Sequence, residues 1–224
     1  MKRSEINNLI REDLEFFDSM NFKLPPWGYW SHEDWKKNRE NCDEIFKNQL
    51  GWDLTDFGSD DFSGTGLLLF TIRNGNLKFD QKPYAEKIMI VGEGQVTPMH
   101  FHWSKMEDII NRGGGNLMME LYNSDENEEF TDQPFEVSMD GIRKVLDPGS
   151  IVRLTPGESI TLYQGLYHKF YGETGKGKVM VGEVSAVNDD HTDNRFHDEL
   201  GRFPEIAEDE PPVHLLVSDY EKYL

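Results

Sequence analysis

A single cysteine, Cys42, is all that the sequence offers, so no disulfide can form within the chain. Long apolar runs are missing too, since no stretch approaches the roughly 18 residues of a membrane-spanning helix. The amino terminus starts with Met1-Lys2-Arg3 and continues into an amphipathic pattern rather than an apolar signal segment. These absences predict a soluble protein of a reducing compartment, and we expect it in the cytoplasm.

Basic residues are scarce as well. The chain has 23 lysines and arginines against 42 aspartates and glutamates, a formal net charge of −19. A field of this sign repels phosphate backbones and disfavours a heavily phosphorylated substrate. A length of 224 residues is enough for one substantial hydrophobic core. We therefore expect a single domain over residues 1–224, with neither nucleic acid nor membrane as its partner.

The first part of the chain has helical periodicity. Residues 4–20 carry apolar side chains at helical spacing, and Ser4 is the expected N-cap. A second helix is predicted to start at Ser31-His-Glu-Asp34, directly after a Pro-rich stretch. Residues 1–60 are therefore predicted to form a helical extension.

The pattern then changes to short strand-like segments separated by glycine and proline, which is typical of an all-β sandwich or barrel. Asn74-Gly75 has the composition of a two-residue type I′ hairpin turn, because both central positions of that turn need positive φ. We expect a β-barrel core over residues 61–190 and a carboxy-terminal wrap over 191–224. The predicted strands cover residues 67–73, 86–91, 96–102, 116–122, 142–146, 150–154, 159–163, 168–172 and 178–184.

The stretch from Gly94 to Gly114 is the richest in potential ligands. His100 and His102 are two residues apart, and side chains at this spacing share one face of a β-strand. Both imidazoles can therefore converge on one ion. Glu107 follows after a short connection, where the chain can fold back and offer a carboxylate. Imidazole plus carboxylate suits a divalent transition metal such as Mn, Fe, Co, Ni or Zn.

A fourth ligand is expected from His168, in the segment Gly165-Leu-Tyr-His168. The spacing G-x5-H-x-H-x4-E-x6-G over residues 94–114 resembles the first motif of the cupin superfamily. Gly165-x2-His168 resembles the core of the second motif, without the Pro-x-Gly that usually precedes it. The resemblance implies a double-stranded β-helix, or jelly-roll barrel, that holds one metal through the two histidines, Glu107 and His168.

Charged residues interrupt three apolar, strand-like runs, at Lys87, Glu120 and Glu183. A charge in such a run is costly to bury unless it is paired or functional. In a metal-holding barrel these side chains would gather on the inward face, and an edge or outward position is the alternative for each. Lys105 lies between two expected ligands, so its ammonium could stabilise a developing enolate oxygen. A solvated turn lysine is the alternative for Lys105.

The run from Asn188 to Arg195 follows the strand that carries Glu183 and is dense in hydrogen-bonding groups. Groups of this kind bind hydroxyls, and a polar surface loop is the alternative. Asp193 and Arg195 are therefore candidate substrate-binding residues, together with Lys87.

The combined pattern resembles one branch of the cupins, the metal-dependent D-lyxose isomerase family. The residues that carry this resemblance are the segments 100–115, 167–170 and 183–195, and the similarity extends over most of the chain. The resemblance implies a Mn2+-containing barrel, with Co2+, Zn2+ or Fe2+ as other possible ions, and an enzyme that interconverts aldoses and ketoses. It also implies D-lyxose and D-xylulose as the reacting pair, D-mannose and D-fructose as a second pair, and a homodimer.

In this reading, the metal binds the oxygens at C1 and C2 of the open-chain sugar, and a carboxylate moves a proton between these carbons through a cis-enediol. Glu183 and Glu120 are the two candidates for the base, Lys105 stabilises enediolate charge, and Lys87, Asp193 and Arg195 hold hydroxyls. Two other functions fit the same ligands. One is an Fe(II) cupin dioxygenase. The many lysines and carboxylates near the expected site disfavour it, because oxygenase pockets tend to be less polar. The other is a non-catalytic sugar-binding cupin.

Overall fold

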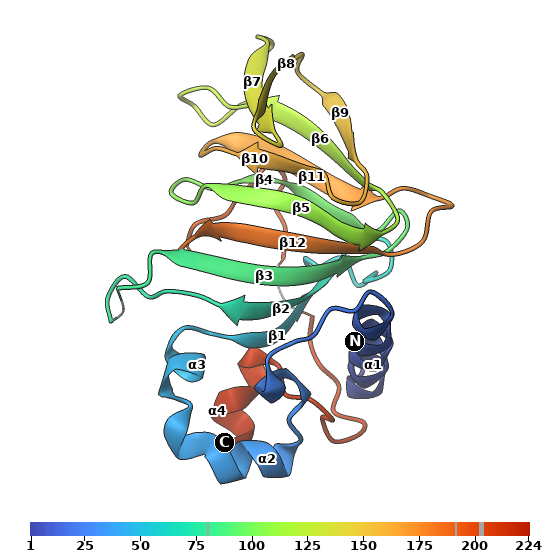
Figure 1. Cartoon of the computed structure of the whole chain (residues 1–224), viewed down its shortest axis with the longest axis vertical. Helices are drawn as coiled ribbons and strands as arrows, with labels where there is room; N and C mark the ends of the chain where they lie inside the picture. Colours follow the sequence, from blue (N-terminus) through green and yellow to red (C-terminus); the bar gives the residue numbers. More distant parts are fainter. Residues whose placement is uncertain (80, 191, 202–203) are drawn as a thin grey trace.

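Two antiparallel β-sheets face each other and enclose the main core (Figure 1). The structure, a computed structural model, describes residues 1–79, 81–190, 192–201 and 204–224. The helices and short 3-10 helices come from the two ends of the chain. They are α1 (Arg3–Ser19), η1 (Pro26–Tyr29), α2 (His32–Asn38), η2 (Arg39–Asn41), α3 (Asp43–Lys47), η3 (Val217–Asp219) and α4 (Tyr220–Tyr223).

In the described part of the chain, one sheet has the order β1-β2-β3-β12-β5-β10-β7-β8 and the other β13-β4-β11-β6-β9. Successive strands repeatedly change sheet, as β4 to β5 and β5 to β6 do, which confirms the predicted double-stranded β-helix. The strands are β1 (Gly51–Thr55), β2 (Leu67–Arg73), β3 (Tyr84–Val91), β4 (Val96–Phe101), β5 (Glu107–Gly114), β6 (Leu117–Asn123), β7 (Phe135–Met139), β8 (Ile142–Leu146), β9 (Ser150–Leu154), β10 (Ser159–Leu162), β11 (Leu166–Gly172), β12 (Val179–Ala186) and β13 (Arg195–Phe196).

The core lies between the sheets because the strands alternate. Along β5, buried residues alternate with more exposed ones, so Ile109 points inward with Glu107. Ile109 packs with Val181 of the same sheet and with Met119 and Phe170 of the facing sheet. The interior is therefore closed by apolar side chains from both sheets.

A second layer covers the outer face of the larger sheet. Apolar residues of α1 recur at helical spacing, and Ile6 and Ile10 pack against Phe70 and other outward side chains of that sheet. The carboxy-terminal segment returns to α1, where the fully buried Arg3 donates hydrogen bonds to Asp219 and Glu208. These hydrogen bonds hold the two ends of the chain together below the barrel, in the lower part of Figure 1.

Several local predictions need correction. Asn74-Gly75 is not a two-residue hairpin turn, since neither residue has positive φ and β3 begins only at Tyr84. The side chain of Asn74 turns inward instead and is buried. Ser4 is not the N-cap of α1, which begins at Arg3, whereas the predicted capping box at Ser31 is confirmed. Strands β1, β5, β7 and β13 were not predicted; β1 lies within residues 1–60, and β13 lies within residues 191–224.

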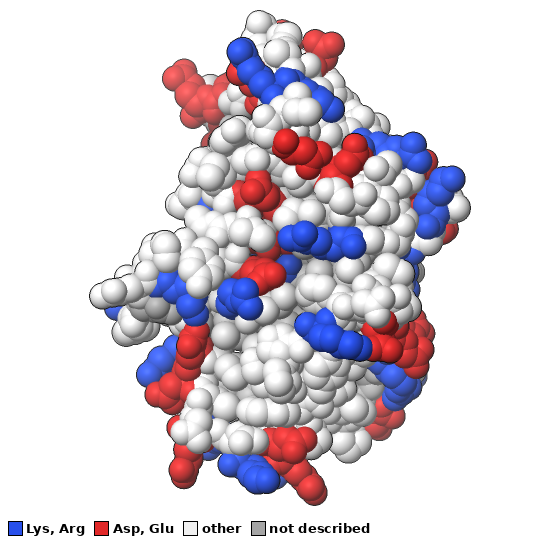
Figure 2. All heavy atoms as spheres, viewed as in Figure 1, with Lys and Arg blue, Asp and Glu red and all other residues white. Residues whose placement is uncertain are grey.

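The outer surface mixes both signs of charge. Figure 2 shows acidic and basic side chains interspersed over one face of the molecule. None of the helices in the described residues is both long enough and apolar enough to span a membrane.

Candidate active site

Three histidines converge at one end of the barrel interior. His100 lies on β4, His168 lies directly opposite it on the neighbouring strand β11, and His102 follows β4 by one residue. One ring nitrogen of each lies within 4.8 Å of the other two, and all three side chains are buried. The two-residue spacing of the sequence motif therefore does what a strand predicts and places both imidazoles on the same face.

Backbone carbonyls fix the orientation of all three rings. The Nδ1 atoms of His100, His102 and His168 lie 2.8, 2.9 and 3.0 Å from the carbonyl oxygens of Pro98, Asp193 and Leu166. A hydrogen on Nδ1 satisfies each carbonyl and leaves the lone pair of Nε2 for a metal. Burial, together with the two neighbouring histidines, lowers the pKa of His100 well below its usual value, so the ring is neutral as a ligand must be.

Glu107 completes this group from the start of β5. Its Oε1 atom lies 3.2 Å from Nε2 of His168 and 3.4 Å from Nε2 of His102. Ligand atoms about 2.1 Å from one ion are separated by about this much. Nε2 of His168 is buried and has no hydrogen-bonding partner among the described residues. A buried nitrogen without a partner is costly, so the four side chains fit a divalent metal better than a purely structural role.

Lys105 joins this ligand set to a second carboxylate. Its ammonium lies 2.7 Å from Oε2 of Glu107 and 2.9 Å from Oε1 of Glu183, and all three side chains are buried. Burial by itself would lower the pKa of Lys105, but the charges of Glu107 and Glu183 outweigh it and raise that pKa. Burial would likewise raise the pKa of Glu107, yet Lys105 and His102 hold it well below its usual range. Lys105 and Glu107 therefore carry opposite charges at neutral pH.

A second ion pair lies beside the first. Lys87 of β3 donates hydrogen bonds of 3.1 and 3.2 Å to Asp190, and its Nζ lies 3.9 Å from Oε2 of Glu183. Burial would raise the pKa of Asp190, but Lys87 and Lys105 outweigh it and lower that pKa. Asn188 bridges the two pairs, because it donates to Asp190 at 2.7 Å and accepts from Lys105 at 3.2 Å.

Sequence reasoning missed both Asp190 and Asn74. Asp190 lies within the polar run 188–195, but nothing local distinguishes it from its neighbours. The buried amide of Asn74 accepts a hydrogen bond from the backbone N–H of Asn188 and donates one to its carbonyl, both at 3.0 Å. Asn74 thereby fixes the loop that carries Asp190. This role was not predicted, because the Asn74-Gly75 pair was interpreted as a hairpin turn.

Three predicted site residues do not line the cavity. Glu120 lies on β6 between inward-facing Met119 and Leu121, so it faces outward, where it pairs with Lys169 and accepts from Tyr122. Asp193 is buried beside the site and accepts from the backbone N–H groups of Ser104 and Lys105 at 2.8 and 2.9 Å. The guanidinium of Arg195 instead contacts Glu128 at 2.9 Å. His191, in the same polar run, lies outside the described residues.

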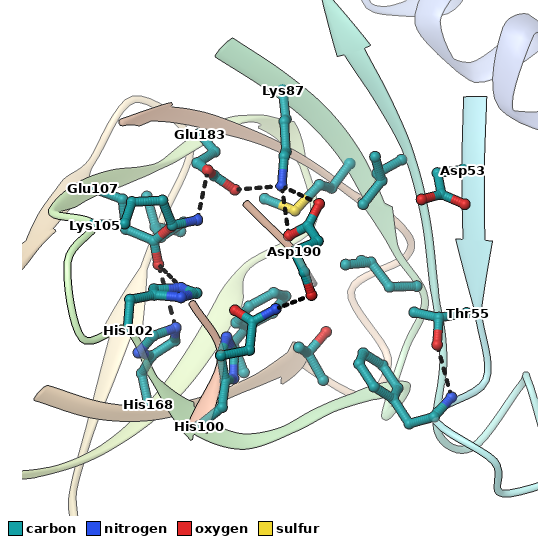
Figure 3. A pocket seen from close by; sticks show the side chains of 18 of the residues that line it. Asp53, Thr55, Lys87, His100, His102, Lys105, Glu107, His168, Glu183 and Asp190 are labelled. Carbon is teal, nitrogen blue, oxygen red and sulfur yellow. Dashed lines mark hydrogen bonds and ion pairs between the residues drawn. The ribbon is translucent and has the colours of Figure 1, made fainter. Parts of the chain in front are cut away.

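A cavity of about 90 Å³ contains the predicted ligands, Lys87, Lys105, Glu183 and Asp190 (Figure 3). Asp53 and Thr55 of β1 also line the cavity, on the side away from the histidines. The wall between is apolar and includes Leu69 and Met89. The arrangement can bind a metal, hold adjacent oxygens and move a proton next to a fixed positive charge.

Comparisons with known proteins agree with this site. The model of the D-lyxose isomerase family matches residues 1–220. A protein of Serratia proteamaculans called D-lyxose/D-mannose isomerase is 49% identical over 227 residues, covering all of both chains. One of the same name from Escherichia coli O157:H7 is 50% identical over 226 residues, again covering all of both chains.

Among solved structures, the L-ribose isomerase of Cellulomonas parahominis is similar with a TM-score of 0.62 and 16% identity, covering 92% of this chain and 98% of that one. The L-ribose isomerase of Acinetobacter sp. DL28 has a TM-score of 0.58 at 16% identity, with 88% and 92% covered. Likeness at this identity supports the barrel fold alone. The match to the family model and the two close relatives carry the assignment further: this chain belongs to the D-lyxose isomerase family, and it is an aldose–ketose isomerase on a cupin barrel rather than an oxygenase or a non-catalytic sugar-binding cupin.

Proposed function

We propose that this enzyme interconverts D-lyxose and D-xylulose, and D-mannose and D-fructose. The observation that carries the proposal is the position of Lys105, which joins the metal ligand Glu107 to the carboxylate of Glu183 in one cavity. The printed names of the two close relatives give the sugars. The strongly acidic chain favours neutral sugars over sugar phosphates.

His100, His102, Glu107 and His168 would hold a divalent ion, and we favour Mn2+, with Co2+, Zn2+ or Fe2+ as substitutes. When bound, such an ion polarises the sugar carbonyl and acidifies the neighbouring C–H. The backbone carbonyls behind the three rings keep each Nε2 directed at the ion.

Glu183 is the group that moves the carbon-bound proton. As a carboxylate, it takes the proton from C2 of the open-chain aldose while the carbonyl oxygen at C1 gains one, which gives a cis-enediol. Glu183 then returns its proton to C1 as the hydroxyl at C2 loses its own, and the ketose results. The ammonium of Lys105, 2.9 Å from Glu183, stabilises the negative charge that develops on the sugar oxygens.

Lys87 and Asp190 hold the next part of the sugar. They form an ion pair that lies between the histidines and Asp53 (Figure 3), and Lys87 donates while Asp190 accepts, so together they suit sugar hydroxyls. Asp190 also lies close enough to Lys87 and Lys105 to remain a carboxylate at neutral pH. Asp193 and Arg195 position the surrounding loop rather than the substrate, because they contact protein groups outside the cavity.

The test is a sugar screen on metal-stripped protein reloaded with Mn2+, Co2+, Zn2+ or Fe2+. We expect turnover of D-lyxose to exceed that of any phosphorylated sugar by at least about tenfold. In D2O, deuterium should appear at C1 of the ketose, because the proton passes through a carboxylate that exchanges with solvent. A clear preference for a sugar phosphate would overturn the substrate assignment, and product without deuterium would overturn the proton-transfer route.

Matched variants test the base. Glu183→Gln should lower turnover by roughly a hundredfold or more with unchanged metal content, since the amide keeps the shape but cannot accept the proton. Glu120→Gln is the control, because Glu120 points away from the cavity, and it should keep near-normal turnover. The reverse pattern would exchange the roles of these two carboxylates.

We also propose that the enzyme works as a cytoplasmic homodimer. Exposed apolar side chains form a row at the cavity end of the larger sheet: Tyr84 and Ala186 at the ends of β3 and β12, Met106 directly before β5 and Tyr163 directly after β10. A row of this kind is suited to burial between two copies. Analytical ultracentrifugation should show a dimer that Met106→Glu weakens and Ile142→Glu, on the distant edge strand β8, does not. Cell fractionation checks the compartment.

A further inference from the structure

A β-bulge in β4 turns one further side chain towards the barrel interior. On β11, the inward-facing His168 and Phe170 are two positions apart. Their partners on β4, His100 and Thr97, are three positions apart, so β4 contains one extra residue between them. Strict alternation would place His100 and Thr97 on opposite faces of the strand. Because of the bulge, both instead share the inward face with their partners, and both are buried.

Thr97 lines the cavity that contains the predicted metal ligands, which we call the metal-binding cavity. It does so from the smaller sheet, whereas Lys87 of β3 and Glu183 of β12 line the same cavity from the larger sheet (Figure 3). Among the described strand residues of the smaller sheet that line the cavity, Thr97 is the polar one besides the histidines. A sugar in this cavity would therefore contact groups from both sheets.

The hydroxyl of Thr97 is buried without a hydrogen-bonding partner in the described part of the chain. The same holds for Oγ1 of Thr131 and for Nε2 of His168, and of these three residues Thr97 and His168 line the metal-binding cavity. For Nε2 of His168, the proposed ion supplies a partner. A buried hydroxyl without a partner is also costly. Valine would fill similar space on a strand without this cost, so packing does not explain the hydroxyl of Thr97.

We propose that Thr97 is a substrate-binding residue, whose hydroxyl forms a hydrogen bond with one of the sugar hydroxyls at C3, C4 or C5. This inference rests on the proposed sugar substrates, and it adds a contact from the sheet that faces Lys87 and Glu183. A threonine hydroxyl can donate and accept, as a sugar hydroxyl can, so the two groups match without a fixed charge. The cross-strand partner Phe170 is apolar, and such surroundings strengthen a hydrogen bond from which water is excluded.

Thr97→Val separates a substrate contact from a structural role, because it removes the hydroxyl and keeps the branched shape. We expect kcat/KM for D-lyxose to fall by about fivefold, the weight of one neutral hydrogen bond, with metal content unchanged. The urea midpoint of the sugar-free protein should stay the same or rise, since a buried polar group without a partner is removed. A lower midpoint would reveal a structural partner of the hydroxyl and would overturn the inference.

Two further variants control this result. Thr97→Ser keeps the hydroxyl and loses the methyl group, so kcat/KM should stay within about twofold of the wild type although the urea midpoint falls. Thr131→Val removes a buried hydroxyl that also lacks a partner among the described residues but does not line the cavity, and its kcat/KM should be normal. A serine variant as impaired as Thr97→Val would contradict the inference. So would an equal loss in Thr131→Val, because the position in the cavity would then not matter.

Deoxy sugars identify the partner of the hydroxyl. In 3-deoxy-, 4-deoxy- and 5-deoxy-D-lyxose, one hydroxyl is missing at a time. For one of the three, Thr97→Val and the wild type should have kcat/KM values within about twofold of each other, because the contact is then absent from both. For the other two, the difference of about fivefold should remain. A difference that persists for all three sugars would disprove the contact, since the hydroxyl would then bind no unreacting part of the sugar.

The wild-type enzyme separates this inference from the proposed function. If the metal-loaded wild type turns over no aldose, the proposed function fails and the inference fails with it. If the wild type is active and Thr97→Val has the same kcat/KM for D-lyxose, the inference alone fails. Competitive inhibition by D-arabinitol, the unreactive alcohol of D-lyxose, measures binding without chemistry. Its inhibition constant should rise by about fivefold in Thr97→Val and stay unchanged in Thr131→Val.

Discussion

The two ends of the barrel interior come from the same strands but contain opposite kinds of side chain. On each of three strands, a polar functional residue and an apolar core residue lie two positions apart on the inward face: Glu107 and Ile109 on β5, His168 and Phe170 on β11, and Glu183 and Val181 on β12. A step of two positions along a strand, about 7 Å, therefore leads from a polar to an apolar side chain, and Ile109 and Phe170 form the apolar boundary of the cavity.

This contrast shows how a barrel tolerates buried charge. Lys105, Glu107 and Glu183 are all almost fully buried, which costs stability even though each has a partner. The apolar end, with Leu117 and Leu154 at no exposure, supplies the hydrophobic stabilisation that offsets this cost. The same apolar surroundings exclude water and strengthen the electrostatic contacts of the catalytic end.

The largest effect is expected from removing a ligand at the catalytic end. His102→Ala should reduce bound metal to background and lower turnover by more than about a hundredfold, because three ligands hold the ion far less tightly than four. Elemental analysis and a D-lyxose assay measure the two quantities. His32→Ala is the control, because His32 lies against Tyr223 at the helical end of the chain, and full metal content is expected there. Full occupancy in His102→Ala would disprove the ligand assignment.

At the apolar end of the barrel, a substitution is expected to lower stability and to leave metal content and turnover unchanged. Leu117 lies on β6 opposite Gly172 of β11, four positions from the partner of His168. Leu117→Ala should lower the free energy of unfolding by about 2–5 kcal/mol, through lost burial and the cavity left behind. Urea unfolding measures this change. The folded variant should keep its metal and its kcat, and a loss of metal would mean that the two ends are not independent.

A smaller effect is expected from Asn74, which holds the loop that carries Asp190 in position. Asn74→Ala removes both hydrogen bonds to the backbone of Asn188, which takes these partners from two partly buried groups and loosens the position of Asp190. We expect turnover to fall by about tenfold with metal content unchanged. Asn76→Ala is the control, because the half-buried Asn76 donates to the carbonyl oxygen of Lys47 instead. Equal activity of both variants would show that the loop keeps its position without the amide.

The smallest effect concerns a buried carboxylate away from the site. Burial on α1 raises the pKa of Asp13 to about 6 from 3.8, only partly opposed by Lys178 at 3.2 Å. Between these values the folded state holds a proton that the unfolded state has lost, so the contribution of Asp13 to stability falls as pH rises. Asp13→Asn should therefore match the wild type near pH 4 and exceed it by about 2 kcal/mol at pH 7.

Urea unfolding at both pH values measures this difference. Glu12→Gln is the control, since Glu12 is mostly exposed and contacts the same lysine, and it should show no such pH dependence. A wild type that is the more stable protein at pH 7 would contradict the assigned direction. If confirmed, the result would show that a buried charge without a catalytic role can be removed with a gain in stability.

Strand periodicity made the cluster of three histidines predictable, whereas the carboxylates were harder to distinguish. Glu183 and Glu120 both interrupt apolar strands, but β6 has methionine on each side of Glu120, so its pattern does not show which face is inward. Strand β1 and the position of Asp53 on it were not predicted, because the aromatic residues around them suggested a helical extension. The connection after Asn74 was misjudged because a local turn signal was given more weight than a partner far along the chain.

The barrel, the family and the convergence of His100, His102 and His168 followed from the sequence alone, because a two-residue step on a strand is a local property that fixes which side chains share a face. Only the tertiary structure decided that Glu183 rather than Glu120 faces the cavity, that Asp190 pairs with Lys87, and that Asn74 supports the loop of Asp190. Each of these outcomes depends on which strands become neighbours and which face they bury. Strand pairing is set by the summed burial and hydrogen bonding of the whole barrel, and no short segment of the sequence contains that information.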